Sequence, residues 1–366
     1  MISLTPRDAQ PRDQEYTSLR KFAERNSASY TPGVRKQALA LSGGGMYGAY
    51  SVGVLCGWSS TGARPEFDVV TGVSTGSLIA TYAFLGAAYD RKLYDAYTSI
   101  TNDDIFRKRW RTAIFFNDAY ASSWPLQRLI DEHLDDGMIA AVAKAHASGR
   151  RLYFGTTNID TRRLVIWDMT AIAASGRRAL YRQVLLASAS LPGFLPPVAI
   201  EVEINGRTYT EYHCDGGATT GVFLRASNLP LTTDAYEGGA TPLAGSDAYV
   251  IVAGKYYSDP VTTPPRTLKI GESALQSLLY SQTRSELFRI YALCTVSGMR
   301  FHLAAVPQEL SVGTDAMTFD RADMMKLYSA GFDAAVTKTV WRDTPPGAEP
   351  QEQTAPRTGT QFLAPR

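Results

Sequence analysis

The sequence predicts an α/β protein with a mainly parallel central sheet, and two observations near its start carry this prediction. Short apolar runs at residues 37–42 and 67–73 suit buried strands, and helix-compatible segments follow at 47–58 and 75–85. A strand, a helix, a second strand and a second helix in this order indicate parallel strands joined by right-handed crossovers. Glycines between each strand and its helix mark the tight turns that this arrangement needs.

The rest of the chain continues as a mixture of strands and helices. Residues 90–148 are predicted to be mainly helical, because apolar side chains recur there at helical spacing. Asn205-Gly206 lies between two strand-like runs and is a strong signal for a two-residue hairpin turn. We expect further strands at 151–157, 164–169, 198–204, 207–213, 248–253 and 300–305, and further helices at 178–189, 272–296 and 322–336.

One large domain is predicted at residues 36–342, and residues 90–148 form a mainly helical insertion in it. Residues 1–35 are polar with mixed charge, and residues 343–366 are rich in Pro, Gln and Thr, so we expect both ends to be poorly ordered. Residues 226–246 contain many Gly, Pro and Thr and are predicted to form a long surface loop, which makes this segment a candidate lid.

The composition is that of an ordinary globular protein. The chain has 366 residues, of which 45% are hydrophobic and 20% charged, and its formal net charge of +2 gives no general attraction to nucleic acid. The three cysteines and four histidines show no metal-ligand spacing. Neither a disulfide framework nor a metal centre is therefore indicated, and no cofactor is expected.

The sequence carries no sign of a stable membrane anchor. No apolar stretch approaches the length of about 18 residues that a membrane-spanning helix needs. The polar N-terminus lacks the apolar core of a signal peptide, so the cytoplasm is the expected location unless an export signal has been trimmed. Any membrane contact is therefore expected to be a transient one at the surface.

The first motif with chemical content is Gly72-Val73-Ser74-Thr75-Gly76, which matches the pattern G-x-S-x-G. An apolar strand precedes the serine and a helix-compatible segment follows it, as this turn requires. The two glycines remove side chains that would collide across the turn, and the helix N-terminus favours negative charge developing near Ser74. Ser74 is therefore a candidate nucleophile, and the alternative is a serine that only caps the helix.

The second motif is the glycine-rich run Gly43-Gly44-Gly45-Met46-Tyr47-Gly48 after the first strand. Acyl transfer needs backbone N–H donors aimed at the developing oxyanion, and adjacent glycines can turn their amides outward because they tolerate positive φ. The carboxyl ends of parallel strands meet at one rim of a sheet, so this loop and Ser74 are expected to lie together. Gly43, Gly44 and Gly45 are therefore candidates for an oxyanion hole.

The same glycines also fit the pattern G-x-G-x-x-G, so a nucleotide-binding module is the main alternative. That pattern expects an acidic residue at the end of the second strand, where it would bind ribose. Here Asp68 lies near the start of that strand, and the strand's end is occupied by the Ser74 motif. The two motifs together therefore favour a serine hydrolase.

Two residues are candidates for the base that would activate Ser74. His302 is the only histidine late in the chain, as the triad order of α/β-hydrolases requires, but no catalytic loop surrounds it. Asp215 follows a predicted strand, and a carboxylate there could accept the serine proton without a histidine; the alternative is a turn aspartate that caps its own backbone. His213 lies two residues before Asp215 on the same side of the strand and is interpreted as a structural histidine.

The glycine-rich run, the Ser74 motif and Asp215-Gly216-Gly217 together resemble the three motifs of the patatin-like phospholipases, in that family's order and at similar separations. The segment from Ala187 to Pro197 is also similar to one that the family carries before its aspartate. The resemblance covers residues 37 to about 305 and makes 36–342 a patatin-like domain.

This resemblance implies a three-layer α/β/α sandwich and the hydrolysis of acyl esters or lipids, as an esterase or a phospholipase A. It implies a Ser–Asp dyad without a catalytic histidine or a metal. Carried over to this sequence, Ser74 is the nucleophile, Asp215 is the base, and the amides of Gly43 to Gly45 form the oxyanion hole.

One position departs from the family's pattern. The family usually has Arg or Lys where this chain has Tyr47, beside the predicted oxyanion loop. The missing positive charge favours a neutral or short-acyl ester over an anionic phospholipid as substrate. Acyl transfer or thioesterase chemistry on the same site, and a non-catalytic lipid-binding role for residues 90–148, are the other interpretations that the sequence leaves open.

Overall fold

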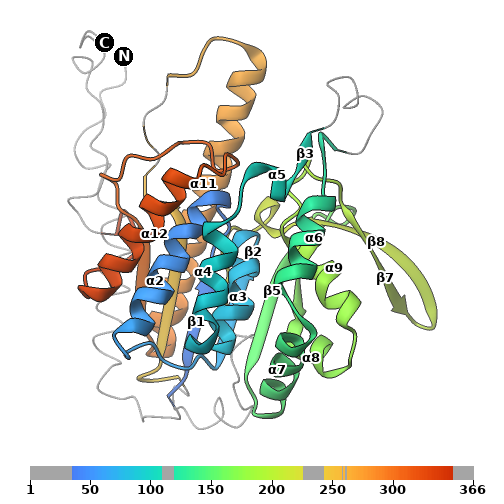
Figure 1. Ribbon diagram of the computed structural model, residues 1–366, viewed down its shortest axis with the longest axis horizontal. Helices are drawn as coiled ribbons and strands as arrows, with labels where there is room; N and C mark the ends of the chain where they lie inside the picture. The colour runs from blue at the N-terminus through green and yellow to red at the C-terminus, as the bar shows by residue number, and fades with distance from the viewer. Residues whose placement is uncertain (1–34, 109–118, 226–242, 258, 260–261, 349–366) are drawn as a thin grey trace, which may run out of the picture.

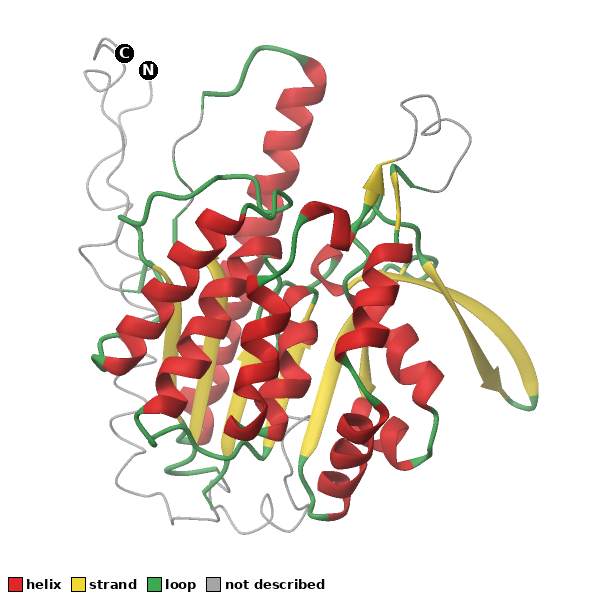
Figure 2. Ribbon diagram, in the orientation of Figure 1, coloured by secondary structure: helices red, strands yellow, loops and turns green. Residues whose placement is uncertain are grey.

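The computed structural model describes residues 35–108, 119–225, 243–257, 259 and 262–348 (Figure 1). The predictions for residues 1–34, for most of the candidate lid (226–242) and for residues 349–366 lie outside the described residues. The described residues form a sheet with helices on both faces (Figure 2).

An eight-stranded sheet forms the centre of the described structure. Its strands are β1 (Gln37–Leu41), β2 (Val69–Val73), β5 (Arg151–Asn158), β6 (Arg163–Asp168), β7 (Val198–Ile204), β8 (Arg207–Asp215), β9 (Asp247–Lys255) and β10 (Arg300–Val306). The order is β10-β9-β1-β2-β5-β8-β7, and β6 pairs with β5. The five strands from β10 to β5 are parallel, whereas β6 and β8 run antiparallel to β5 and β7 runs antiparallel to β8.

Ten α-helices surround this sheet among the described residues. They are α2 (Gly48–Ser60), α3 (Thr75–Leu85), α4 (Asp90–Thr98), α5 (Asn102–Ile105), α6 (Trp124–His133), α7 (Asp136–Ala147), α8 (Met169–Ala174), α9 (Arg178–Ser188), α11 (Thr267–Ser297) and α12 (Arg321–Val336). No helix in the described part of the chain is both long and apolar enough to cross a membrane.

The two faces of the sheet contribute to two separate apolar cores. Leu39 and Val70 pack with α2, α3, α4 and α12 on one face, whereas Ala38 and Val69 pack with α11 on the other. Neighbouring residues of a strand point to opposite faces, so one short apolar run serves both cores. The molecule is therefore a three-layer α/β/α sandwich with a mainly parallel sheet, and the predicted fold class is confirmed.

The predicted strands and helices are all found, with their boundaries displaced by a few residues. The described part of 90–148 is mainly helical and also holds a short antiparallel pair, β3 (Arg107–Lys108) and β4 (Ala121–Ser122). Asn205 and Gly206 have φ angles of 54° and 75°, which suit the tight hairpin turn expected between β7 and β8.

Residues 343–348, which were predicted to belong to the C-terminal tail, lie among the described residues. The backbone of Arg342 exchanges two hydrogen bonds with that of Leu303 on β10, at 2.7 and 3.0 Å. Ala348 is 2% exposed. Residues 345, 346 and 348 are buried although the composition of this segment is typical of a disordered tail.

Glycines let α2 and α12 pack with their backbones in close approach. A Cβ atom added at Gly53 of α2 would lie 2.1 Å from the carbonyl oxygen of Tyr328, and one added at Gly331 of α12 would lie 2.4 Å from that of Tyr50. Neither position can therefore accept a side chain without a backbone shift. Because α2 begins directly after the glycine-rich run, this contact also holds one side of the candidate site.

We expect Gly53→Ala to lower the free energy of unfolding by about 1–3 kcal/mol, because its methyl group would overpack the α2–α12 contact. Gly271→Ala in α11 is the matched control, since a Cβ atom there meets nothing within 4 Å. The control should raise stability by up to about 1 kcal/mol through its higher helix propensity. Urea unfolding measures both, and a neutral Gly53→Ala would show that the helices pack less closely than described.

Candidate active site

The topology brings the two predicted motifs to one rim of the sheet. β1 and β2 are parallel neighbours, with Leu41 paired to Gly72, so the turns that follow them leave the sheet side by side. A Cβ atom added at Gly43 would lie 3.0 Å from the Cβ of Ser74. The glycine-rich run and the candidate nucleophile are therefore in contact.

Ser74 occupies a strained turn between β2 and α3. Its φ of 54° and ψ of −127° are rare for a residue with a side chain and cost on the order of 1–3 kcal/mol. Both motif glycines are needed there: a Cβ atom at Gly76 would lie 2.3 Å from the carbonyl oxygen of Leu41, and one at Gly72 would lie 2.7 Å from that of Gly76. The turn holds Ser74 at the start of α3 with its side chain partly exposed.

Two buried serines, Ser188 at the end of α9 and Ser190 just after it, bond to the backbones of Ser74 and Asp215. The Oγ of Ser188 accepts a hydrogen bond from the Ser74 amide at 3.2 Å and donates one to the Gly155 carbonyl at 2.7 Å. The carbonyl of Ser190 accepts a hydrogen bond from the amide of Asp215 at 2.8 Å. Sequence reasoning gave these serines no role, and the family resemblance of their segment was the only signal for them.

Asp215 reaches Ser74 because β2 and β8 share one edge of β5. β6 pairs with Tyr153 to Asn158 on the other edge of β5, which leaves the first edge to β2 and β8. β2 pairs with the first part of that edge and β8 with the part that follows. Val73 pairs with Gly155, and Asp215 pairs with the next residue along β5. The end of β8 therefore meets the end of β2, and the two predicted dyad residues lie side by side.

The carboxyl group of Asp215 is 3% exposed, and this burial raises its pKa to about 6. Hydrogen bonding from the Ser74 hydroxyl acts in the opposite direction and lowers the pKa. The amide of Gly217 also lowers it by donating a hydrogen bond to Oδ1 at 2.7 Å. The site therefore combines a hydroxyl with a carboxylate that is ionised at neutral pH and more basic than an exposed one.

The glycine-rich run offers two amides rather than three for an oxyanion. The amide of Gly43, which was also predicted for the oxyanion hole, donates a hydrogen bond to the Gly221 carbonyl at 3.0 Å. Gly44 and Gly45 have φ angles of 157° and 55°, and their amides find no acceptor among the described residues. The Thr75 hydroxyl donates to the Gly45 carbonyl at 3.0 Å and ties the loop to α3.

His213 is held by two partners that do not belong to the dyad. Its Nδ1 lies 2.9 Å from the hydroxyl of Thr156, and its Nε2 lies 3.0 Å from a carboxylate oxygen of Glu211. The imidazole is fully buried, and it packs against Trp167. These contacts are those of a structural histidine.

His302 lies too far from Ser74 to act as its base. The strand registers place it level with Val70 on β2, and β10 is three strands from β2, which is roughly 14 Å at 4.8 Å per strand. Its Nε2 hydrogen-bonds to Asp247 at 2.8 Å, at the opposite end of the sheet. The geometry therefore gives the histidine-triad alternative no support.

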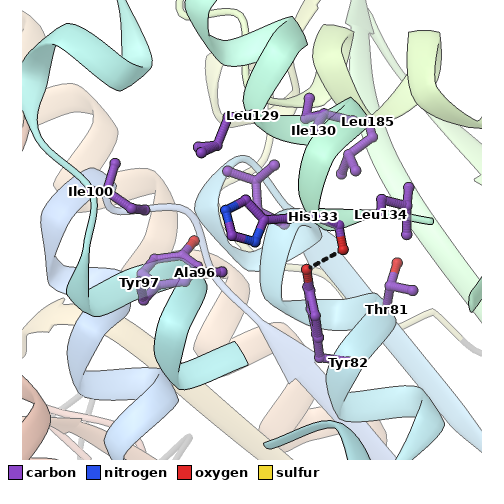
Figure 3. Close-up of a pocket in the computed structure, with 11 residues that line it drawn as sticks. Thr81, Tyr82, Ala96, Tyr97, Ile100, Leu129, Ile130, His133, Leu134 and Leu185 are labelled. Carbon is purple, nitrogen blue, oxygen red and sulfur yellow. Dashed lines mark hydrogen bonds between the residues drawn. The ribbon is translucent and has the colours of Figure 1, made fainter. Parts of the chain in front are cut away.

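An apolar cavity of about 40 Å³ lies beside α3, between this helix, α4 and α6 (Figure 3). Leu78 and Tyr82 of α3 are among the residues that line it. Tyr97 of α4 and Leu129 of α6 form opposite walls.

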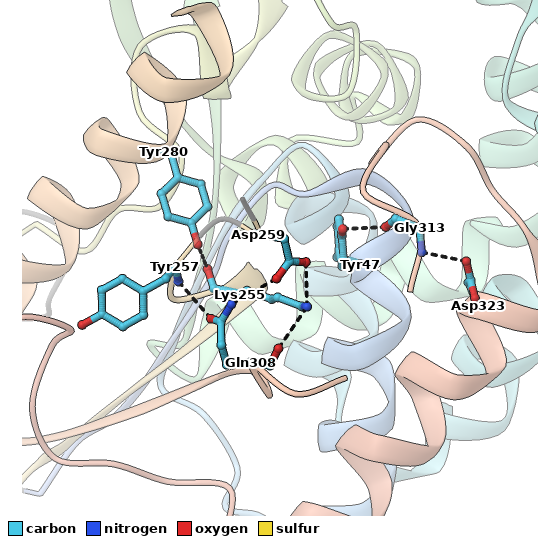
Figure 4. A network of polar contacts seen from close by, with 8 residues as sticks. All are labelled: Tyr47, Lys255, Tyr257, Asp259, Tyr280, Gln308, Gly313 and Asp323. Atoms are coloured by element: carbon cyan, nitrogen blue, oxygen red, sulfur yellow. Dashed lines mark hydrogen bonds and ion pairs between the residues drawn. The ribbon is translucent and has the colours of Figure 1, made fainter. Parts of the chain in front are cut away.

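Tyr47 stands beside the glycine loop in acidic surroundings (Figure 4). Its hydroxyl donates a hydrogen bond to the Gly313 carbonyl at 2.7 Å. Burial raises its pKa, and so does the negative charge of the nearby Asp259, Asp323 and Asp315. The side chain at this position therefore adds no positive charge to the loop.

Figure 4 also shows Lys255 near Tyr47, and the ammonium group of Lys255 is bonded to other residues. Its Nζ donates to a carboxylate oxygen of Asp259 at 2.7 Å and to the Gln308 carbonyl at 3.1 Å. No group of three or more side chains suited to a metal ion occurs among the described residues, and all three cysteines there are free thiols.

The raised pKa of Asp215 leads to a prediction about stability. Because this pKa lies above the ordinary value near 4, the Asp215 carboxylate binds a proton more tightly in the folded state than in the unfolded state. The stability that this proton contributes is fully present below about pH 4 and is lost as the pH rises through about 6. Asp215→Asn, which stays neutral, should therefore exceed the wild type in unfolding free energy at pH 8, by on the order of 1–3 kcal/mol.

Urea unfolding at pH 4 and pH 8 measures this difference. The gap between the two proteins should nearly vanish at pH 4, where both carry a neutral side chain at this position. A gap of the same size at both pH values would contradict the raised pKa.

Comparison with known proteins identifies the family. The model of the patatin-like phospholipases matches residues 39–233, more than half of the chain. VipD from Legionella pneumophila is similar at 12% identity over 83% of this chain and 67% of that one, with a TM-score of 0.39. Human GIVD cytosolic phospholipase A2, in complex with methyl gamma-linolenyl fluorophosphonate, is similar at 11% identity over 90% and 62%, with a TM-score of 0.35. No curated protein matches. On the family match, this chain belongs to the patatin-like phospholipase family.

Proposed function

We propose that this protein is a serine hydrolase that cleaves lipid acyl esters with Ser74 as nucleophile and Asp215 as base. Membership of the patatin-like phospholipase family supports lipid acyl hydrolase activity in general. The observation that carries the more specific proposal is that the ends of β2 and β8 bring Ser74 next to the buried carboxylate of Asp215, whose pKa the Ser74 hydroxyl lowers.

The reaction needs only groups that this site contains. Asp215 takes the proton of Ser74 as Oγ attacks the ester carbonyl carbon, and the resulting oxyanion accepts hydrogen bonds from the amides of Gly44 and Gly45. Asp215 then gives the proton to the departing alcohol, which leaves an acyl-enzyme. A water molecule, deprotonated by the same carboxylate, releases the acid and restores Ser74.

The surroundings of Tyr47 favour uncharged or zwitterionic substrates over anionic ones. A negatively charged head group above the glycine loop would meet Asp315 and Asp323 nearby, while Lys255 is paired with Asp259 and Lys326 with Asp323. Neutral lipid esters therefore fit this rim better than anionic phospholipids do.

Acyl transfer, thioester hydrolysis and nucleotide binding are the other functions that the glycine loop and Ser74 could serve. Acyl transfer and thioester hydrolysis would proceed through the same acyl-enzyme, so the acceptor and the leaving group alone separate them from ester hydrolysis. A nucleotide-binding module lacks its ribose-binding acid, because Asp68 hydrogen-bonds to the Gln37 amide at 2.8 Å and to Lys36 at the far end of the sheet.

The dyad predicts which variants lose activity. Ser74→Ala and Asp215→Asn should each reduce hydrolysis of p-nitrophenyl butyrate by roughly a thousandfold or more, because each removes an essential partner in proton transfer. His302→Gln is the control and should stay within about threefold of the wild type, since its contact is with Asp247. Loss of activity in His302→Gln equal to that in Ser74→Ala would instead support a histidine triad.

Charge at position 47 predicts head-group preference. Tyr47→Arg should raise the rate on phosphatidylglycerol relative to phosphatidylcholine by about fivefold, which corresponds to ~1 kcal/mol of attraction near the protein surface. Tyr47→Phe removes the hydroxyl without adding charge and should leave this ratio unchanged. Both lipids are presented in micelles of a neutral detergent, and an equal ratio in all three proteins would show that position 47 does not face the head group.

A further inference from the structure

We propose that the outer part of α11 (residues 267–279) and Trp124 of α6 dock this protein on the surface of aggregated lipid whose head groups are uncharged or zwitterionic. This inference rests on the proposed function, because the docking brings Ser74 to a lipid that lies in that surface. It adds the residues that hold the protein there and the kind of surface that they suit.

The middle of α11 lies beside the candidate site. The side-chain amide of Gln282 donates a hydrogen bond to the carbonyl of Thr219, four residues after Asp215. The hydroxyl of Tyr280 donates one to the last carbonyl of β9. Before Tyr280 the helix continues past this rim of the sheet, where Figure 1 shows its first turns projecting in light orange. Ile270 stands roughly 18 Å beyond Gln282 at 1.5 Å per residue.

This projecting end exposes large aliphatic side chains. Ile270, Leu275 and Leu278 are 54%, 57% and 67% exposed. Residues 275, 278 and 282 are spaced three and four apart and therefore share one face of the helix. Because Gln282 reaches Thr219 from that face, Leu275 and Leu278 stand on the side of α11 that faces the Thr219 segment. The two leucines therefore continue the rim of the candidate site as an apolar surface.

Trp124 is a further large apolar side chain exposed at this rim. It begins α6 and is 58% exposed. Shortly before it, the amide of Ala121 donates a hydrogen bond to the Phe194 carbonyl at 2.9 Å, which ties this end of α6 to the segment after Ser190. α6 and α11 pack into the apolar cores on opposite faces of the sheet, so Trp124 and the leucines of α11 flank the candidate site from two sides.

The charges of these elements suit a surface without net negative charge. Residues 267–279 contain one cation and one anion, Lys269 and Glu272, and α6 contains one arginine against one aspartate and one glutamate. At the glycine loop, the negative charge of Asp315 and Asp323 raises the pKa of Tyr47. No excess of positive charge on α6 or the outer part of α11 therefore draws the protein to anionic lipid.

Lipid is the partner that the position of this surface favours. Membership of the patatin-like phospholipase family implies a lipid substrate, and long-chain lipids gather in bilayers and micelles because water excludes their hydrocarbon. A helix that lies in such a surface buries its apolar face about 5–10 Å into the head-group region. The exposed side chains of α11 and α6 flank the residues that are proposed to act on this lipid.

The test measures how much protein sediments with vesicles of dioleoyl phosphatidylcholine. All proteins carry Ser74→Ala, so the lipid stays intact and binding is measured apart from catalysis. Leu278→Ser and Trp124→Ser should each weaken the partition onto these vesicles by about tenfold, the effect of losing one buried apolar side chain. Val296→Ser is the matched control and should bind as its parent does, since Val296 is 55% exposed but lies in the last turn of α11, at the opposite end of the helix.

A second readout uses the protein with Ser74 in place. Leu278→Ser should lower the hydrolysis of phosphatidylcholine in vesicles by about the same factor as its binding. Hydrolysis of dissolved p-nitrophenyl butyrate, which needs no lipid surface, should change by less than about twofold.

The outcomes separate this inference from the proposed function. Equal partition of all four Ser74→Ala proteins would overturn the docking surface and leave the proposed function standing. Binding confined to phosphatidylglycerol vesicles and lost at high salt would contradict the choice of a neutral surface. A dimer in sedimentation equilibrium that Leu278→Ser dissociates, without vesicle binding by any of the proteins, would assign this face to a second copy of the chain and sink the proposal. Hydrolysis of p-nitrophenyl butyrate that persists in Ser74→Ala would overturn the proposed function, while the binding result stands by itself.

Discussion

The division of one edge of β5 between two strands is the constraint on which the rest of the site depends. β2 occupies that edge as far as Val73, and β8 takes it over at Asp215 from the opposite direction. The turns that follow these strands therefore bring a hydroxyl and a carboxyl group together. The junction is tight, since a Cβ atom at Gly216 would lie 2.5 Å from the Gly155 carbonyl oxygen. Every other feature of the site, from the glycine loop to the serines of α9, is arranged around this meeting point.

In the proposed mechanism, the same junction lets a carboxylate act as the base without a histidine. Burial makes the ionised form of Asp215 less stable than in water, so its pKa lies near 6 and the group is a stronger base than an exposed aspartate. That burial, together with the strained backbone of Ser74, costs stability. The surrounding packing offsets this cost, above all the close contact between α2 and α12 and the two apolar cores on either face of the sheet.

The sequence predicted the fold well because the apolar periodicity of strands and helices is local. It also named the two residues that the structure brings together, since Ser74 and Asp215 each stand in a short recognisable motif. It could not predict the use of the Gly43 amide by Gly221, the role of Ser188, or the partner of His302, because each of these contacts joins segments far apart in the chain. The burial of residues 345, 346 and 348 was missed because composition alone does not reveal which residues of a Pro-rich segment pack against the domain.

The central claim is that Ser74 is activated by a carboxylate with a pKa near 6. The most direct measurement is the rate at which a fluorophosphonate labels the folded protein between pH 4 and 9, with the adduct located by mass spectrometry. The account predicts a single adduct on Ser74, a labelling rate that rises with an apparent pKa of about 6, and no such rise in Asp215→Asn. A folded protein with Ser74 unlabelled, or a pH profile that Asp215→Asn leaves unchanged, would contradict it.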